Sequence, residues 1–191
     1  MKMDTKERIL VESMKLFSVN GFDSVSVRMI ADAVGVGNSA LYKHYKSKQA
    51  ILDAIVEKSK QRFCMQYENE VQQIQGLKKL KEMCLEMYEF QTKDEWMVMF
   101  RRLLVIEQFK NPQMAKLYQQ FFIELPVQSQ AALFSKLIEE NMMVDRNPEV
   151  MAMELYAPFF LYHMATKDNI AMLLEKHVEN FMEMYFIKKE G

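Results

Sequence analysis

The chain has 191 residues, of which 50% are hydrophobic, with only 5 Gly and 4 Pro. This length can bury a sizeable core without disulfide or metal support, and the scarcity of turn-forming residues predicts a mostly helical protein. The net charge of −1 conceals two halves of opposite charge. Residues 1–62 hold 11 basic and 7 acidic residues, and residues 63–191 hold 14 basic and 19 acidic residues. The overall charge therefore does not exclude a charged partner for either half.

The sequence carries no membrane or metal signal. The longest apolar run, residues 155–162, contains Pro158 and is far shorter than the roughly 20 residues that cross a bilayer. The polar N-terminus lacks the apolar segment of a secretory signal, so we expect a cytoplasmic protein with no membrane partner. Cys64 and Cys84 show no C-x-x-C spacing and predict buried, reduced thiols, with no metal and no cofactor.

The first 47 residues predict three short helices. In the first two, apolar residues recur at the helical spacing i, i+3, i+4, and the breaks fall at Gly21 and Gly35. Ser26 is placed to cap the second helix, and Ser47 to cap the long helix that follows the third. The three helices are expected over residues 6–19, 26–34 and 38–45.

The third of these helices has few core residues, mainly Leu41 and Tyr45, and a helix this polar is expected to face a partner. It follows the tight turn 35–37, and two short helices joined in this way form a helix-turn-helix. In that motif the second helix enters the major groove of DNA, where it bonds base edges while flanking groups bond phosphates. The residue types suit such contacts at Gly37, Asn38, Ser39, Tyr42, Lys43, His44, Lys46 and Lys48.

Three segments resemble the DNA-binding domain of the TetR family of transcriptional regulators: residues 5–22, 25–36 and 37–48. The family pattern I-L-x-A-A-x-x-L-F-x-x-x-G-[FY] is matched except that Glu12 and Ser13 replace the small pair. The pattern L-Y-x-[HY]-F-x-[SN]-K survives with Tyr45 in place of Phe, although the acidic pair that often follows is absent.

The resemblance implies an all-α homodimer that mostly represses transcription, with double-stranded DNA bound by its N-terminal domain and a small molecule by its C-terminal domain. Arg28 and Lys46 are either DNA contacts or ordinary solvent-exposed helix residues. Tyr45 is better interpreted as a core residue than as a DNA contact. Carried over residue by residue, the resemblance implies DNA contacts at Arg28, Asn38, Ser39, Tyr42, Lys43, His44 and Lys48.

The rest of the chain predicts six further helices, over residues 47–74, 77–92, 95–109, 112–143, 148–165 and 168–187. Pro126 is expected to kink or divide its helix, because proline lacks an N–H and clashes with the preceding turn. The predicted fold is therefore all-α with about nine helices. A helix-turn-helix domain, residues 1–47, is joined by a long helix to an effector-binding and dimerisation domain, residues 48–191.

The second half is rich in soft and aromatic side chains, with 14 of the 18 Met and 11 of the 13 Phe after residue 62. Taken singly, these residues are best interpreted as core residues. The isolated His163 is also best interpreted as a hydrogen-bonded core residue. Taken together, they lie on helices that surround the ligand cavity in similar proteins and favour a hydrophobic or aromatic effector. The candidate effector residues are Met83, Met87, Trp96, Met97, Phe100, Met114, Tyr118, Phe121, Phe122 and His163.

Each of the last two helices carries a wide apolar stripe. In a monomer, one such stripe would be enough. Such a pair can pack with its symmetry mate into a four-helix bundle, and the dimer would present two recognition helices about 34–36 Å apart to a pseudo-palindromic operator. The expected interface residues are Met151, Leu155, Phe159, Tyr162, Ile170, Leu174, His177, Phe181, Met184 and Tyr185.

Two other classes of function compete with a DNA-binding regulator. An enzyme is disfavoured, since the sequence has no phosphate-cradling glycine loop, no H-E-x-x-H and no nucleophile elbow. A helical lipid-binding or protein-binding module without DNA binding is the other alternative. The salt dependence of DNA binding separates a DNA-binding regulator from such a module. If Lys48 binds a phosphate of DNA, Lys48→Ala lowers the slope of the logarithm of DNA affinity against the logarithm of salt concentration by about one.

Overall fold

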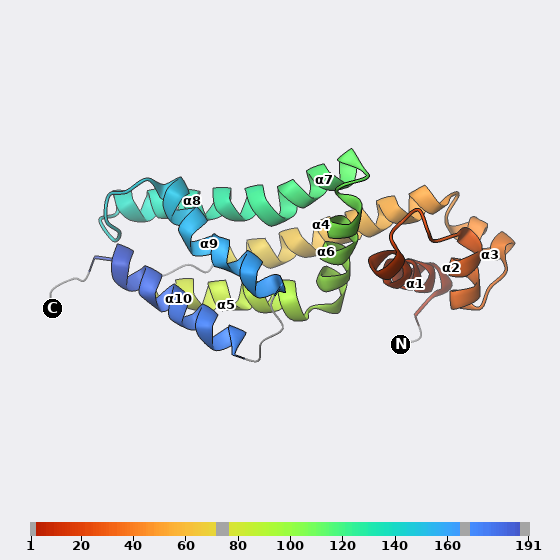
Figure 1. Cartoon of the computed structure of the whole chain (residues 1–191), viewed down its shortest axis with the longest axis horizontal. Helices are drawn as coiled ribbons and strands as arrows, with labels where there is room; N and C mark the ends of the chain where they lie inside the picture. Colours follow the sequence, from red (N-terminus) through yellow and green to blue (C-terminus); the bar gives the residue numbers. More distant parts are fainter. Residues whose placement is uncertain (1–2, 72–76, 165–168, 188–191) are drawn as a thin grey trace. The chain divides into compact units, whose positions relative to one another are not determined.

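The computed structural model describes residues 3–71, 77–164 and 169–187, excluding the side chains of residues 67–71, 77–79, 163 and 164. Within these ranges the chain forms ten α-helices and one π-helix (Figure 1). Among the described residues, one isolated β-bridge pairs Met143 with Phe186. The all-α prediction is therefore confirmed.

The N-terminal helices begin and end where their capping residues predict. The Ser26 hydroxyl accepts a hydrogen bond from the N–H of Met29 at 3.2 Å, and the Ser47 hydroxyl accepts one from the N–H of Ala50 at 3.0 Å. Each bond satisfies one of the free N–H groups of a first helical turn. The four helices are α1 (Thr5–Asn20), α2 (Val27–Val34), α3 (Asn38–His44) and α4 (Lys48–Val71).

The helix predicted over residues 112–143 is divided, and its last part ends earlier than predicted, at Glu139. The π-helix η1 (Gln120–Glu124) interrupts it, and Pro126 stands in the first turn of the next helix. The carbonyl of Phe122, four residues before Pro126, accepts a hydrogen bond from the Tyr156 hydroxyl at 3.0 Å. The remaining helices are α5 (Leu77–Lys93), α6 (Glu95–Glu107), α7 (Pro112–Gln119), α8 (Leu125–Glu139), α9 (Pro148–Met164) and α10 (Ile170–Tyr185).

The chain packs as two compact units. One comprises Met1–Val71 with Gln91–Tyr118, and the other Gln72–Phe90 with Gln119–Gly191. The first unit thus contains α6 and α7 as well as the three N-terminal helices and α4. This division describes packing, whereas a functional boundary after residue 47 stays a prediction.

In the first unit, α1 packs against α2, α3, α4 and α6. Side chains from these helices form its core, and each is fully buried or nearly so: Ile9, Phe17, Ile30, Leu41, Ile51, Ile55 and Phe100. Truncating a core side chain of this size to Ala typically destabilises a protein by about 2–5 kcal/mol. The base on which α3 rests is therefore a well-packed hydrophobic core.

In the second unit, α8 packs against α9, and α9 against α10. The Lys81 ammonium joins α5 to α10 through ion pairs with Glu175 at 2.7 Å and Glu179 at 2.6 Å, and these hydrogen bonds raise the pKa of Lys81. Cys84 is buried as predicted, whereas Cys64 is exposed, which corrects the expectation of two buried thiols. None of the helices described combines the length and the apolar character needed to cross a membrane.

Candidate nucleic-acid interface

The turn between α2 and α3 depends on one left-handed glycine. Gly35 has φ +74°, and this conformation lets the N–H of Gly35 bond the carbonyl of Asp32 at 3.1 Å and that of Val36 bond Ala31 at 3.0 Å. Gly37 has an extended φ of −76° and is the N-cap of α3, with no side-chain cap. Only the first glycine of the predicted turn therefore uses a positive φ.

Helix α3 is anchored by two side chains and exposes the rest. Leu41 is fully buried, and Tyr45, just after the helix, is 7% exposed. Burial raises the pKa of Tyr45, and the nearby Glu7 and Asp4 carboxylates raise it further, so this phenol stays neutral. The predicted DNA contacts Arg28, Gly37, Asn38, Ser39, Tyr42, Lys43, His44 and Lys46 are all exposed.

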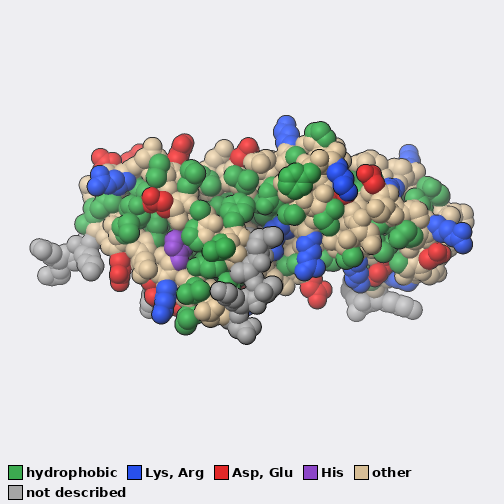
Figure 2. Space-filling model, viewed as in Figure 1, with side chains coloured by type: hydrophobic (Ala, Val, Ile, Leu, Met, Phe, Trp, Pro, Cys, Tyr) green, Lys and Arg blue, Asp and Glu red, His purple; other side chains and the backbone are tan. Residues whose placement is uncertain are grey.

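The cations around α3 are weakly engaged within the described part of the chain. Arg28 lies 3.9 Å from Asp32 one turn along α2, with both side chains mostly in water. An exposed pair of this kind is worth roughly 0–1 kcal/mol, so an anion of a partner can displace it. Lys and Arg side chains are visible at the end of the first unit that holds α2 and α3 (Figures 1 and 2).

Lys48 differs from the other predicted contacts, because its ammonium is turned inward. Its Nζ donates to the carbonyls of Phe22 at 2.7 Å and Val25 at 2.9 Å, with a longer contact to Asp23 at 3.4 Å. It also lies 4.3 Å from the centre of the Phe22 ring. The three hydrogens of the ammonium thus have acceptors inside the protein, which argues against the predicted phosphate contact of Lys48.

This placement predicts different phenotypes for two lysines that lie two residues apart. Lys46→Ala is expected to lower the slope of log affinity against log salt by about 0.9, the contribution of one phosphate contact. Lys48→Ala is expected to leave that slope unchanged and to reduce stability, because it frees the carbonyls between α1 and α2. Fluorescence anisotropy over a salt series and denaturant unfolding measure the two effects. Lys136→Ala, an exposed lysine on α8, is the control; equal slopes for Lys46→Ala and Lys136→Ala would contradict the assignment.

The segment between α1 and α2 is held from its other side by Glu107, the last residue of α6. Glu107 is 2% exposed, and its Oε1 accepts the N–H of Phe22 at 2.9 Å. Gly21 lies against the same carboxylate: a Cβ built on it would stand 2.7 Å from Oε1. A carboxylate 85 residues away in sequence and the Lys48 ammonium therefore fix the chain that enters the helix-turn-helix.

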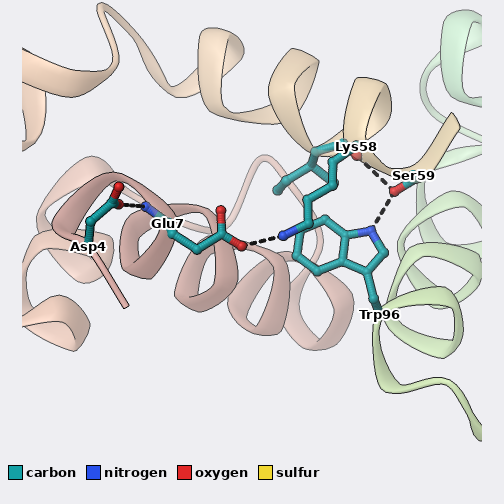
Figure 3. A network of polar contacts seen from close by, with 6 residues as sticks. Asp4, Glu7, Lys58, Ser59 and Trp96 are labelled. Carbon is teal, nitrogen blue, oxygen red and sulfur yellow. Dashed lines mark hydrogen bonds and ion pairs between the residues drawn. The ribbon is translucent and has the colours of Figure 1, made fainter. Parts of the chain in front are cut away.

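Trp96 belongs to a packing network of the first unit (Figure 3). Its indole Nε1 donates to the Ser59 hydroxyl at 2.8 Å, and the Lys58 ammonium lies 4.5 Å from the centre of its ring. Lys58 also pairs with Glu7, whose N–H is capped by Asp4. The network joins α6 to α4 and α1, so the structure gives Trp96 a packing contact where the sequence predicted an effector contact.

The other candidate effector residues are divided between the units. Met97, Phe100 and Met114 are buried and Tyr118 half-buried in the first unit. Phe121 and Phe122 are buried and Met83 and Met87 half-buried in the second unit, while the His163 side chain lies outside the described residues. Effector binding by this set stays a prediction.

The residues expected at the dimer interface mostly form the core of their own unit. Tyr162 packs partly buried against that core, His177 contacts the Leu155 carbonyl at 3.0 Å and Tyr185 donates to Glu154, whereas Met184 is 67% exposed. A fully buried side chain is not available to a second copy, which corrects six assignments. These six are Met151, Leu155, Phe159, Ile170, Leu174 and Phe181.

Across the described ranges, no group of three or more His, Cys, Asp or Glu side chains is arranged to hold a metal ion. What the N-terminal helices do form is a helix-turn-helix: two short helices joined at a left-handed glycine, with the second presented to solvent on a packed base. This geometry is that of a nucleic-acid-binding module.

The N-terminal part of the chain is similar to known transcriptional regulators. Residues 9–55 match the family described as "Bacterial regulatory proteins, tetR family". The chain is 41% identical over 49 residues to the HTH-type transcriptional regulator YerO of Bacillus subtilis and 31% identical over 70 residues to UidR of Escherichia coli K12. These matches cover 26% and 37% of this chain but only 17% and 36% of those proteins. The N-terminal part of the chain, residues 9–55, is therefore similar to the DNA-binding domain of tetR-family regulators.

Solved structures extend the similarity of fold to nearly the whole chain. The complex of triclosan with SmeT, the repressor of the Stenotrophomonas maltophilia multidrug efflux pump SmeDEF, matches with TM-score 0.70 and 18% identity, over 97% of this chain and 93% of that one. Salmonella enterica GusR matches with TM-score 0.66 and 22% identity, over 94% and 95%. At these sequence identities the similarity shows that the second half of the chain has the same fold as those proteins. It does not indicate which ligand this chain binds.

Proposed function

We propose that this protein is a ligand-responsive transcriptional regulator, a repressor that binds a pseudo-palindromic operator as a homodimer and is released by a small hydrophobic or aromatic effector. The proposal includes action in the cytoplasm, because the proposed partner is DNA. The observation that carries the proposal is the exposure of α3, whose polar side chains face solvent while Leu41 and Tyr45 hold it on the core.

The leading end of α3 suits direct contact with bases. Asn38 and Ser39 are exposed in the first turn, and an Asn amide bonds the N6 and N7 of adenine bidentately. A Cβ on Gly37 would meet nothing closer than the Ser39 hydroxyl at 3.9 Å, so the fold itself does not require glycine there. A missing side chain at this exposed point instead leaves room for a close approach of DNA.

The homodimer is proposed to form through the outer faces of α9 and α10. Met153 and Leu161, separated by two turns of α9, are 58% and 68% exposed, and hydrophobic side chains are visible over these helices (Figure 2). Contiguous exposed apolar surface of this kind marks interaction sites, and a two-fold axis joins the same patch on two copies. The patch residues, hereafter the outer face, are Val150, Met153, Leu161, Met172, Leu173 and Met184.

An effector releases the protein from DNA only if the effector binds the DNA-free conformation more tightly than the DNA-bound conformation. The methionine-rich and aromatic interior supports an apolar ligand, since thioethers adapt to varied shapes. SmeT, which shares the fold, is solved with triclosan. The relatives compared are transcriptional regulators, which supports a regulator over an enzyme.

Asn38→Ala tests direct readout by α3. The substitution is expected to weaken binding of the cognate duplex by about 1–3 kcal/mol, roughly 5-fold to 150-fold, and to leave binding to random duplex nearly unchanged, because phosphate contacts carry the latter. Fluorescence anisotropy with both duplexes measures this, with Gln128→Ala on α8 as the exposed control. Absence of DNA binding by the unmodified protein at low salt would instead favour a lipid-binding or protein-binding module.

A further inference from the structure

One lysine of α1 lies beside the end of α3. The Lys6 ammonium is 5.9 Å from the centre of the Tyr45 ring, and Tyr45 is the C-cap of α3. An aromatic ring attracts a cation at this distance without accepting its N–H groups in ordinary hydrogen bonds. The contact therefore places a positive charge of α1 next to the last turn of α3, with its donors still available.

The two carboxylates nearest to Lys6 in sequence are engaged by other groups (Figure 3). Asp4 accepts the N–H of Glu7 at 2.7 Å and caps α1. Glu7 pairs with Lys58, whose ammonium also lies 4.5 Å from the centre of the Trp96 ring. Lys6 is exposed and has no ion pair with any residue that the structure describes. Its ammonium is therefore free to bind an anion of a partner.

The end of α3 carries two further lysines. Lys43 lies in the last turn of the helix, and Lys46 directly follows Tyr45; both are exposed and have no ion pair within the described ranges. Tyr45 is buried in an extended conformation, so the side chain of the next residue points to solvent. With Lys6 and Lys58, four ammonium groups face two carboxylates, those of Asp4 and Glu7, which leaves a net charge of +2 at this corner. This excess favours a polyanion.

We propose that Lys6 binds a backbone phosphate of DNA, beside the phosphate assigned to Lys46. In a helix-turn-helix complex the N-terminal residues of the second helix contact base edges, while flanking elements contact the backbone. The Tyr45 ring holds the Lys6 ammonium at the flank of α3 and leaves its hydrogens unused, whereas those of Lys48 have acceptors inside the protein. The inference rests on the proposed function and deepens it by adding a DNA contact from α1.

Lys6→Ala tests this contact through the salt dependence of DNA binding. One phosphate contact contributes about 0.9 to the slope of the logarithm of DNA affinity against the logarithm of salt concentration. The variant is therefore expected to bind both operator and random duplex about 15-fold more weakly at 50 mM salt and about 4-fold more weakly at 200 mM salt. Lys6→Arg keeps the charge and is expected to keep the slope. Fluorescence anisotropy over a salt series measures these effects.

Lys110→Ala is the control, because it removes one positive charge from the same unit at a distance from α3. Lys110 is exposed after α6, three residues beyond Glu107, whose carboxylate lies against Gly21 at the other end of α1. We expect its slope to equal that of the unmodified protein. Equal slopes for Lys6→Ala and Lys110→Ala, with a lower slope for Lys46→Ala, overturn the inference and leave the proposed function standing. No duplex binding by the unmodified protein at low salt overturns both.

Discussion

Gly21→Ala is expected to destabilise the first unit by about 3 kcal/mol or more. Gly21 has φ +78° and ψ 164°, a region that is essentially restricted to glycine, and placing another residue there costs about 1–3 kcal/mol. The added Cβ would also stand 2.7 Å from Glu107 Oε1 and 3.3 Å from Ile106 Cγ2. The carboxylate must then move and release the Phe22 N–H, which adds about 1–3 kcal/mol. Denaturant unfolding measures the loss.

Gly35→Ala is the matched control for this prediction. Gly35 has a similar φ of +74° but has no atom within 4 Å of a built Cβ, so its substitution carries only the backbone strain, about 1 kcal/mol. If the two variants lose equal stability, the contact with Glu107 contributes nothing. In the double variant Gly21→Ala, Glu107→Ala, the clash is absent, and the combined loss is expected to be smaller than the sum of the single losses.

Substituting aspartate for both Met153 and Leu161 is expected to convert the protein to monomers and to weaken operator binding by at least about 100-fold. Both side chains are mostly exposed, so the fold of the second unit tolerates the change. In a two-fold interface each aspartate occurs twice and is buried without a partner, which costs several kcal/mol. A monomer also engages only one half-site at a time. Sedimentation velocity and anisotropy with the operator measure the two effects.

Phe109→Asp supplies the control, because Phe109 is an 87% exposed hydrophobic residue outside α9 and α10. It is expected to leave the oligomeric state unchanged. A double variant that sediments as a dimer would show that the outer face is not the interface. A monomeric variant that binds the operator with unchanged affinity would show that dimerisation is not needed for binding.

Local sequence signals predicted the N-terminal fold well. Helical periodicity, Ser26 and Ser47 as caps and glycine at positions 21 and 35 place the first helices within about two residues of their observed ends. These signals act over one or two turns, so they can be read without knowledge of the fold. The exposure of α3 was predictable for the same reason, since few of its residues are apolar.

Contacts between distant segments were not predictable in this way. The Lys48 side chain matches a phosphate contact by residue type and family resemblance, and only the fold brings the carbonyls of Phe22 and Val25 within its reach. In the sequence, Glu107 is indistinguishable from other charged residues near the end of a helix. Its place beside Gly21 follows from the packing of α6 against α1.

The proposed dimer face shows a third limit. Helix α9 is apolar on more than one side, with Leu155 and Phe159 on the side that packs against its own unit and Met153 and Leu161 on an exposed side. Periodicity finds both stripes but does not rank them, because both have the spacing of a helix. The sequence analysis therefore assigned the stripe with Leu155 and Phe159 to the partner, whereas the structure uses it as core.

Selection of random duplexes by the purified protein tests the central claim most directly. The account predicts an enriched inverted repeat, whose half-sites lie about 10 base pairs or a multiple apart, because two copies of α3 related by a two-fold axis read the same sequence on opposite strands. Recovery of no preferred sequence, or of a single unrepeated site, would contradict binding by a symmetric pair of recognition helices.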